Sequence, residues 1–194
     1  QNLAEALSSQ LNCIGIDNFN LVSRQKISNL PQLGKTYVDL LLANYSPQLP
    51  IKLLGWSFGG NIALEMAWQL EQKGYHQIEV YLLDTMITNE QLKLTFTPEE
   101  LLIMRNETAI KLAREGFDTE TADNIIAAYR SEMTLDNDWL SGALTHTTVA
   151  LLKAGKAATT NAKYRARFEQ MILLKDNNVS EFIGAEAASK LTIH

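Results

Sequence analysis

The strongest constraint on this chain of 194 residues is the segment Ile51–Ala63, where an apolar run leads directly into a glycine-rich turn and then a helix. Ile51–Leu54 has the character of a short buried strand, and the turn reads Gly55-Trp56-Ser57-Phe58-Gly59-Gly60. The segment Phe58–Lys73 predicts a helix that ends at Gly74. A strand that turns at once into a helix is the repeating unit of α/β proteins.

Further units of this kind precede Asp84, and mainly helices follow it. Apolar patterns predict helices over residues 2–10 and 33–45 and strands over residues 11–16 and 78–83. This alternation implies a mostly parallel sheet with helices on both faces. Over residues 97–163 the sequence predicts only helices, starting at Thr97, Asp118 and Asp136, the last running to Ala158. We interpret this insertion as a helical lid, and strand patterns return at residues 171–174 and 191–193.

The glycine-rich turn has the pattern of a nucleophile elbow, in which a serine sits on a sharp, strained turn between strand and helix. Gly55 and Gly59 are expected to be required because side chains there would collide with the adjoining strand and helix. Ser57 would then lie above the helix N-terminus, and the N–H of Phe58 would be an oxyanion-hole donor. The alternative is a glycine-rich turn with an incidental serine. A phosphate-binding loop is disfavoured, since no lysine follows the last glycine.

Asp84 is the second candidate catalytic residue. It follows the next apolar strand and stands 27 residues after Ser57. One strand–helix–strand step returns the chain to the same edge of the sheet, and the order serine, acid, histidine is that of α/β-hydrolases. We interpret Asp84 as the triad acid that orients an imidazole; the alternative is a residue that only caps a loop.

These residues resemble the chain-terminating thioesterase domains of nonribosomal peptide and polyketide synthetases, which have the α/β-hydrolase fold. The resemblance rests on Gly55-Trp56-Ser57-Phe58-Gly59-Gly60 and on Leu82-Leu83-Asp84-Thr85. It implies release of an acyl or peptidyl chain from the 4'-phosphopantetheine of a carrier protein through a Ser57 acyl-enzyme, by hydrolysis or cyclisation. It also implies that the domain itself binds no cofactor or metal. The alternatives are a stand-alone editing thioesterase, a general esterase or lipase, and a catalytically inert carrier-docking module.

The base is the missing part of this pattern. His76 follows a helix end, His146 falls within a predicted lid helix, and His194 comes directly after a strand without the intervening loop of the family. We therefore expect the catalytic histidine to lie beyond His194. The family also has a strand and a loop before the first helix, and that loop supplies a second oxyanion donor. We expect residues 1–194 to be one thioesterase domain that is incomplete at both ends.

Composition excludes several other classes of protein. The formal net charge of −5 argues against nucleic-acid binding, and the longest apolar runs are far shorter than a membrane span. The single cysteine, Cys13, cannot form an internal disulfide and fits a reducing, cytoplasmic compartment.

Overall fold

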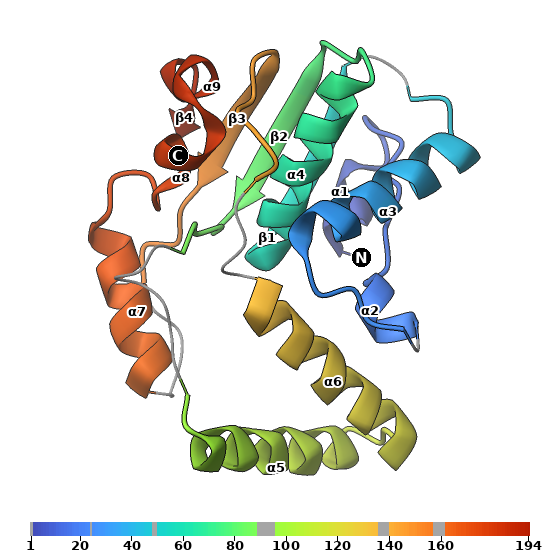
Figure 1. The fold of residues 1–194 in the computed structure, drawn as a ribbon, viewed down its shortest axis with the longest axis vertical. Helices are drawn as coiled ribbons and strands as arrows, with labels where there is room; N and C mark the ends of the chain where they lie inside the picture. The colour runs from blue at the N-terminus through green and yellow to red at the C-terminus, as the bar shows by residue number, and fades with distance from the viewer. Residues whose placement is uncertain (1, 24, 48–49, 89–95, 136–139, 157–161) are drawn as a thin grey trace.

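A computed structural model describes residues 2–23, 25–47, 50–88, 96–135, 140–156 and 162–194, which form a parallel sheet with helices packed against it (Figure 1). The strands are β1 (Ile51–Trp56), β2 (Ile78–Leu83), β3 (Thr147–Leu152) and β4 (Thr192–Ile193). The helices are α1 (Asn2–Leu7), α2 (Phe19–Val22), α3 (Leu30–Asn44), α4 (Phe58–Gln72), α5 (Pro98–Arg114), α6 (Thr119–Leu135), α7 (Ala162–Leu173), α8 (Val179–Ile183) and α9 (Ala185–Ser189).

The strands lie in the order β1-β2-β3-β4 and every pairing is parallel, which confirms the predicted sheet. Trp56 pairs with Leu83, and Leu83 pairs with Leu152, so the first three strands end at the same level. In Figure 1 the strand arrows point toward α5, α6 and α7. The carboxyl edge of the sheet therefore faces these three helices.

The core lies between the sheet and helix α4. On β2 the buried residues Ile78, Val80 and Leu82 alternate with half-buried ones, as expected for a strand with one face against a core. They pack in one cluster with α4 residues such as Leu64 and Leu70. On the other face of the sheet, side chains such as Trp56, 72% exposed, are not covered by the described residues.

Several helix ends follow the sequence prediction. The Thr97 hydroxyl accepts the N–H of Glu100, whose carboxylate accepts the N–H of Thr97, so α5 begins with a complete capping box. Asp118 accepts the N–H of Thr121 at the start of α6. Gly74, with φ of 89°, ends α4.

The predicted strand at residues 11–16 is wrong. This segment has no regular structure, and Leu11, Ile14 and Ile16 are exposed. An extended segment becomes a strand only when a neighbour pairs with its backbone N–H and C=O groups. No strand of the described part of the chain pairs with it.

The prediction of a third lid helix over residues 136–158 is also wrong for the residues that the structure describes. Residues 136–139 and 157–158 lie outside the described residues, residues 140–146 are not helical, and Thr147–Leu152 is strand β3. Thr147, Thr148 and Val149 are β-branched and favour a strand, and the position between β2 and β4 supplies two pairing partners. The predicted lid range 97–163 therefore includes a strand of the main sheet. Before that strand, the described residues of the range form helices α5 and α6.

The predicted strand at residues 171–174 is the end of helix α7. Phe168, Met171 and Leu174 recur every three residues and pack in one cluster with Met86. This spacing is that of one face of a helix. The strand was predicted from the short apolar run alone, and such a run occurs in buried helices as well as in strands. The predicted final strand is confirmed as the two-residue strand β4.

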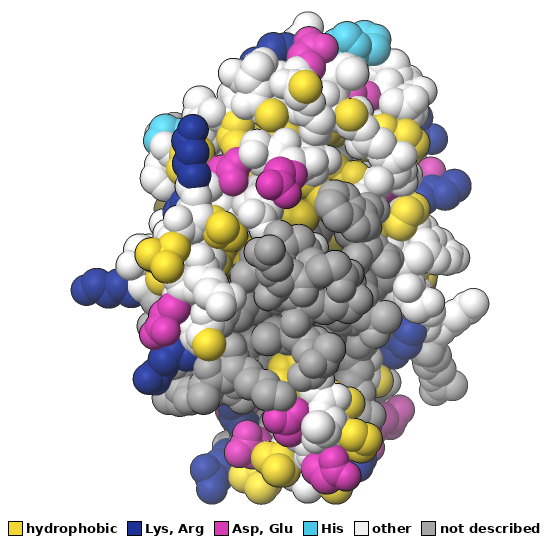
Figure 2. All heavy atoms as spheres, turned by 60° about the vertical axis from the view of Figure 1, so that its left-hand side comes forward, with side chains coloured by type: hydrophobic (Ala, Val, Ile, Leu, Met, Phe, Trp, Pro, Cys, Tyr) yellow, Lys and Arg dark blue, Asp and Glu magenta, His cyan; other side chains and the backbone are white. Residues whose placement is uncertain are grey.

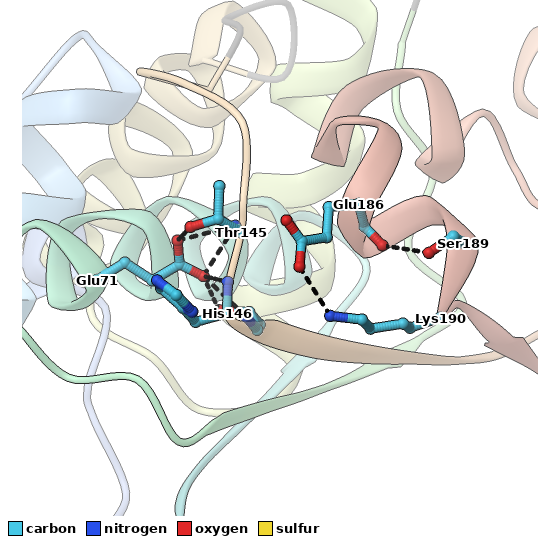
Figure 3. Close-up of polar contacts among 7 residues, drawn as sticks. Glu71, Thr145, His146, Glu186, Ser189 and Lys190 are labelled. Carbon is cyan, nitrogen blue, oxygen red and sulfur yellow. Dashed lines mark hydrogen bonds and ion pairs between the residues drawn. The ribbon is translucent and has the colours of Figure 1, made fainter.

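A buried carboxylate ties the start of β3 to the end of α4. Glu71 accepts the backbone N–H groups of Thr145, His146 and Thr147, at 2.9, 2.9 and 2.8 Å, and the hydroxyls of both threonines. Figure 3 shows its carboxylate pointing to Thr145 and His146. Burial alone would raise the pKa of Glu71, but the bonds from the Thr147 hydroxyl and from the N–H groups of Thr145 and His146 hold this pKa below its usual value.

We expect Glu71→Gln to lower the free energy of unfolding by about 1–3 kcal/mol, because an amide NH2 cannot accept and leaves donors unpaired. Since the folded pKa of Glu71 is depressed, its stabilisation is full above the unfolded pKa of about 4.3 and is lost as pH falls through the lower folded pKa. Urea unfolding at pH 7 and between pH 5 and 3 measures both effects.

The matched control is Glu79→Gln, which removes a half-exposed ion pair with Lys52. A surface pair of this kind contributes about 0–1 kcal/mol. Equal losses of stability in the two variants at pH 7 would contradict the role given to Glu71.

Candidate functional site

Two polar residues stand side by side at the carboxyl edge of the sheet. Ser57 follows Trp56 at the end of β1, Asp84 follows Leu83 at the end of β2, and Trp56 and Leu83 are paired. Neighbouring strands lie about 4.8 Å apart, so the register alone places the two backbones next to each other. The structure therefore brings together the serine and the acid predicted from the sequence.

Ser57 occupies a strained turn, as predicted for an elbow. Its φ of 52° and ψ of −125° lie outside the usual regions for a residue with a side chain. Its N–H donates to the Leu83 carbonyl at 2.9 Å, so it still belongs to the sheet. Its carbonyl accepts the Gly60 N–H at 3.0 Å and the Thr85 hydroxyl at 3.1 Å, so the same residue also starts α4. Ser57 itself is exposed.

The glycines of the turn are not equally constrained. A Cβ on Gly55 would lie 2.2 Å from the Gly59 carbonyl oxygen, and one on Gly60 would lie 1.9 Å from the Thr85 hydroxyl. Among the described residues, a Cβ on Gly59 would meet no atom within 4 Å. The requirement predicted for Gly55 is confirmed and that for Gly59 is wrong. Gly60 is the second glycine that close packing demands, because α4 begins against the Thr85 side chain.

Phe58 is the first residue of α4 and carries the predicted oxyanion donor. The first N–H groups of a helix have no acceptor within the helix and carry its positive dipole end. The half-buried Phe58 side chain packs against the main core, which fixes this first turn. A donor that directly follows an exposed serine is suited to bind an anionic oxygen.

Asp84 is held in one place by the end of strand β3. Its N–H donates to the Leu152 carbonyl at 2.8 Å, and its carboxylate accepts the Ala154 N–H at 3.1 Å. Its φ is 49° and the residue is half-buried. A carboxylate has two oxygens that accept hydrogen bonds, so Asp84 can also accept a further donor such as an imidazole N–H.

Asn177 and Asn178, which the sequence analysis missed, hold the segment that follows Asp84. The Asn177 side chain donates to the Thr85 carbonyl at 3.0 Å, and the backbone carbonyl of Asn177 accepts the Ile87 N–H at 3.0 Å. The Asn178 side chain donates to the Ile87 carbonyl at 3.3 Å. The only available signal was the Asn-Asn pair itself, because asparagine tolerates the left-handed conformation that both residues adopt.

Backbone strain is concentrated at this edge. In the described ranges the non-glycine residues with positive φ are Ser57, Asp84, Asn177 and Asn178. All four belong to the serine turn, the Asp84 turn or the asparagine pair that holds the latter. Strained backbone of this kind persists only where the surrounding structure enforces it, and it is often found at active sites.

None of the three histidines lies beside Ser57. His76 and His146 precede β2 and β3, at the amino edge of the sheet, and their rings contact each other. His194 directly follows β4 and extends its pairing with β3: the His194 N–H donates to the Leu151 carbonyl at 2.9 Å. Since β4 is three positions from β1, His194 stands about 14 Å from the serine strand.

Helices α5 and α6 form a hairpin on the carboxyl side of the sheet, the side of Ser57 and Asp84 (Figure 1). Leu102, Ile103 and Ile110 of α5 are exposed.

Within the described ranges, no group of three or more His, Cys, Asp or Glu residues could hold a metal ion. The helices in those ranges also include none that is long and apolar enough to cross a membrane.

Comparison with known proteins gives consistent results. A family model for thioesterase domains matches residues 1–130. Over 74 residues, 38% of this chain and 1% of that protein, the sequence is 34% identical to Tyrocidine synthase 3 of Brevibacillus parabrevis.

Among solved structures, the fold is similar to the NocB thioesterase domain in covalent complex with a fluorophosphonate nocardicin G analog. The TM-score is 0.58 at 19% identity, over 91% of this chain and 68% of that one. It is also similar to a four-domain nonribosomal peptide synthetase, AB3403, with a TM-score of 0.57 at 17% identity, over 92% of this chain and 15% of that one. For the type II thioesterase BorB the TM-score is 0.50 at 15% identity, over 87% and 61%.

We expect Gly60→Ala to lower the free energy of unfolding by about 1–3 kcal/mol, because the new Cβ overlaps the Thr85 hydroxyl. Gly59→Ala is the matched control and should change stability by less than about 1 kcal/mol, since its Cβ would contact none of the described residues and alanine favours a helix. Urea unfolding of both variants measures the difference. Equal destabilisation, or a larger effect at Gly59, would show that the turn does not have this geometry.

Proposed function

Because the chain belongs to the thioesterase domain family, we propose that Ser57 is the nucleophile that releases an acyl or peptidyl chain from a carrier protein. The observation that carries this proposal is the pairing of Trp56 with Leu83, which sets the strained Ser57 directly beside Asp84. A serine held on such a turn, exposed and next to a helix N-terminus, has the position that acyl transfer requires.

In the proposed reaction the Ser57 oxygen attacks the thioester carbonyl while its proton passes to a base. The oxygen of the carbonyl becomes negative, and the N–H of Phe58 stabilises this charge more than it stabilises the neutral substrate. The carbon–sulfur bond then breaks, the pantetheine sulfur leaves as a thiol after taking up the proton, and the chain remains as an ester on Ser57. Water releases it as an acid, or an internal nucleophile of the chain releases it as a ring.

Asp84 would act on the base rather than on the substrate. Its carboxylate, fixed by the Ala154 N–H, would hold an imidazole in one tautomer and stabilise its protonated form. We place this imidazole beyond His194 in the chain order serine, acid, histidine. The position of His194 on the far side of β3, away from β2, supports this placement.

Helices α5 and α6 would cover the bound chain. They lie on the Ser57 side of the sheet, and their exposed apolar residues suit contact with an acyl or peptidyl group. The substrate would arrive on the 4'-phosphopantetheine of a carrier domain, and the domain itself would need no cofactor. The lone, exposed Cys13 fits a cytoplasmic setting.

An editing role, in which short misloaded chains are cleared from carriers, uses the same site. The similarity to BorB is one of fold alone, at 15% identity. The segment shared with Tyrocidine synthase 3 favours a domain of a synthetase over a stand-alone enzyme, and chain release is the role proposed for such a domain. Comparison of acetyl and peptidyl pantetheine thioesters separates the two roles, because an editing enzyme would process both whereas a releasing enzyme would prefer the long chain.

We expect Ser57→Ala in the intact protein to reduce hydrolysis of an acyl-pantetheine thioester to background, because no acyl-enzyme can form. Asp84→Asn should reduce turnover by about 10²–10⁴-fold with little change in stability, since it removes control of the imidazole tautomer. Steady-state thiol release measures both. Ser46→Ala and Asp39→Asn, at exposed positions away from this edge, should retain full activity. Activity retained in Ser57→Ala would contradict the proposal.

The placement of the base gives a separate prediction. In the intact protein, His194→Ala should retain most of the activity, because the backbone of His194 is bound into the β3–β4 ladder about 14 Å from β1. The pH dependence of kcat/KM should also be unchanged. Loss of turnover to the level of Ser57→Ala would identify His194 as the base and overturn this placement.

A further inference from the structure

The amino edge of the sheet, opposite Ser57, carries a pair of histidines in direct contact. His76 stands two residues before β2 and His146 one residue before β3, and Ile78 pairs with Thr147. Their ring centroids are 4.3 Å apart with planes at 61°. Both residues are exposed, and they lie at the end of the sheet where β2 and β3 begin, at the top of Figure 1. Figure 2 shows histidine side chains on the molecular surface.

Both histidines are carried by firmly held backbone. The N–H of His146 donates to the Glu71 carboxylate at 2.9 Å, and the same carboxylate binds the residues on either side of it (Figure 3). His76 follows the end of α4, where Gly74 is left-handed and the Tyr75 N–H donates to the Leu70 carbonyl at 3.1 Å. The pair is thus close before any ligand binds, which reduces the entropy lost on binding.

The spacing of the rings points to a type of metal coordination. With metal–nitrogen distances of about 2.0–2.1 Å, two imidazole centres lie about 4.5 Å apart when they subtend a right angle at the metal, and about 5.2 Å apart in a tetrahedral site. The separation of 4.3 Å is closer to the first value. The terminal torsion of histidine is broad, so the ring nitrogens can turn to converge.

We propose that His76 and His146 form a chelating site for a divalent transition-metal ion that favours right-angle coordination, Cu²⁺ or Ni²⁺. Imidazole is a preferred ligand of both ions. The Glu71 carboxylate is engaged by five donors and acts as the support of His146, not as a ligand. Since the described part of the chain provides no group of three ligands, water completes the coordination. The proposed metal site is independent of the role of Ser57. It lies at the opposite edge of the sheet, and the length of the strands separates the two sites by roughly 20 Å.

The test is calorimetric titration of the intact protein with Cu²⁺ and with Ni²⁺. In each titration, wild-type protein should bind one metal ion at this site. His76→Ala or His146→Ala should weaken this binding by about tenfold or more, because a single ring cannot chelate. His194→Ala, which removes an exposed histidine elsewhere, should leave the binding unchanged. Mg²⁺, which prefers oxygen ligands, should not compete.

A second measurement does not depend on variants. Diethylpyrocarbonate modifies exposed histidines, and peptide mass spectrometry locates the modification. Saturating Ni²⁺ should protect His76 and His146 together and leave His194 reactive. If the metal protects neither ring, or if the two alanine variants bind it as tightly as wild type, the rings are in packing contact only and the proposal is wrong.

Discussion

The parallel pairing of β1 with β2 is the constraint on which the rest of the site depends. Because Trp56 pairs with Leu83, the chain leaves both strands at one level, and a shift of one residue would separate Ser57 from Asp84 and turn their side chains to other directions. The bond from the Ser57 N–H to the Leu83 carbonyl and the bond from the Thr85 hydroxyl to the Ser57 carbonyl join the two turns. The close approach of Gly60 to Thr85 then requires a glycine where α4 begins.

Helix α4 connects this edge to the remainder of the sheet through two buried carboxylates. Glu71 binds the residues that lead into β3, and Glu65 accepts the N–H and the hydroxyl of Ser141 at 2.9 and 2.7 Å. Burial of an acid is unfavourable unless hydrogen bonds satisfy it, and here the donors come from the connection that delivers β3. Since the end of β3 in turn holds the N–H and carboxylate of Asp84, the position of the acid depends on contacts made at the middle and at the end of α4.

The sequence predicted the parts of the structure that depend on local pattern. The elbow, the parallel sheet, the helix start at Thr97 and the position of Asp84 all follow from residues close in the chain. The errors arose where partners distant in sequence decide the outcome. The apolar segment at residues 11–16 has no pairing strand, Thr147–Leu152 becomes a strand between β2 and β4, and residues 171–173 complete a helix that packs on Met86. The asparagine pair could not be foreseen because its hydrogen bonds reach back some ninety residues to the turn after Asp84.

The central claim is that Ser57 is the activated nucleophile of this fold. The most direct measurement is reaction of the intact protein with a serine-reactive fluorophosphonate, followed by proteolysis and mass spectrometry of the labelled peptides. The account predicts one stoichiometric adduct, on the peptide that contains Ser57, and no adduct on the other serines. An adduct on a different residue, or no adduct under conditions in which the protein is folded, would contradict it.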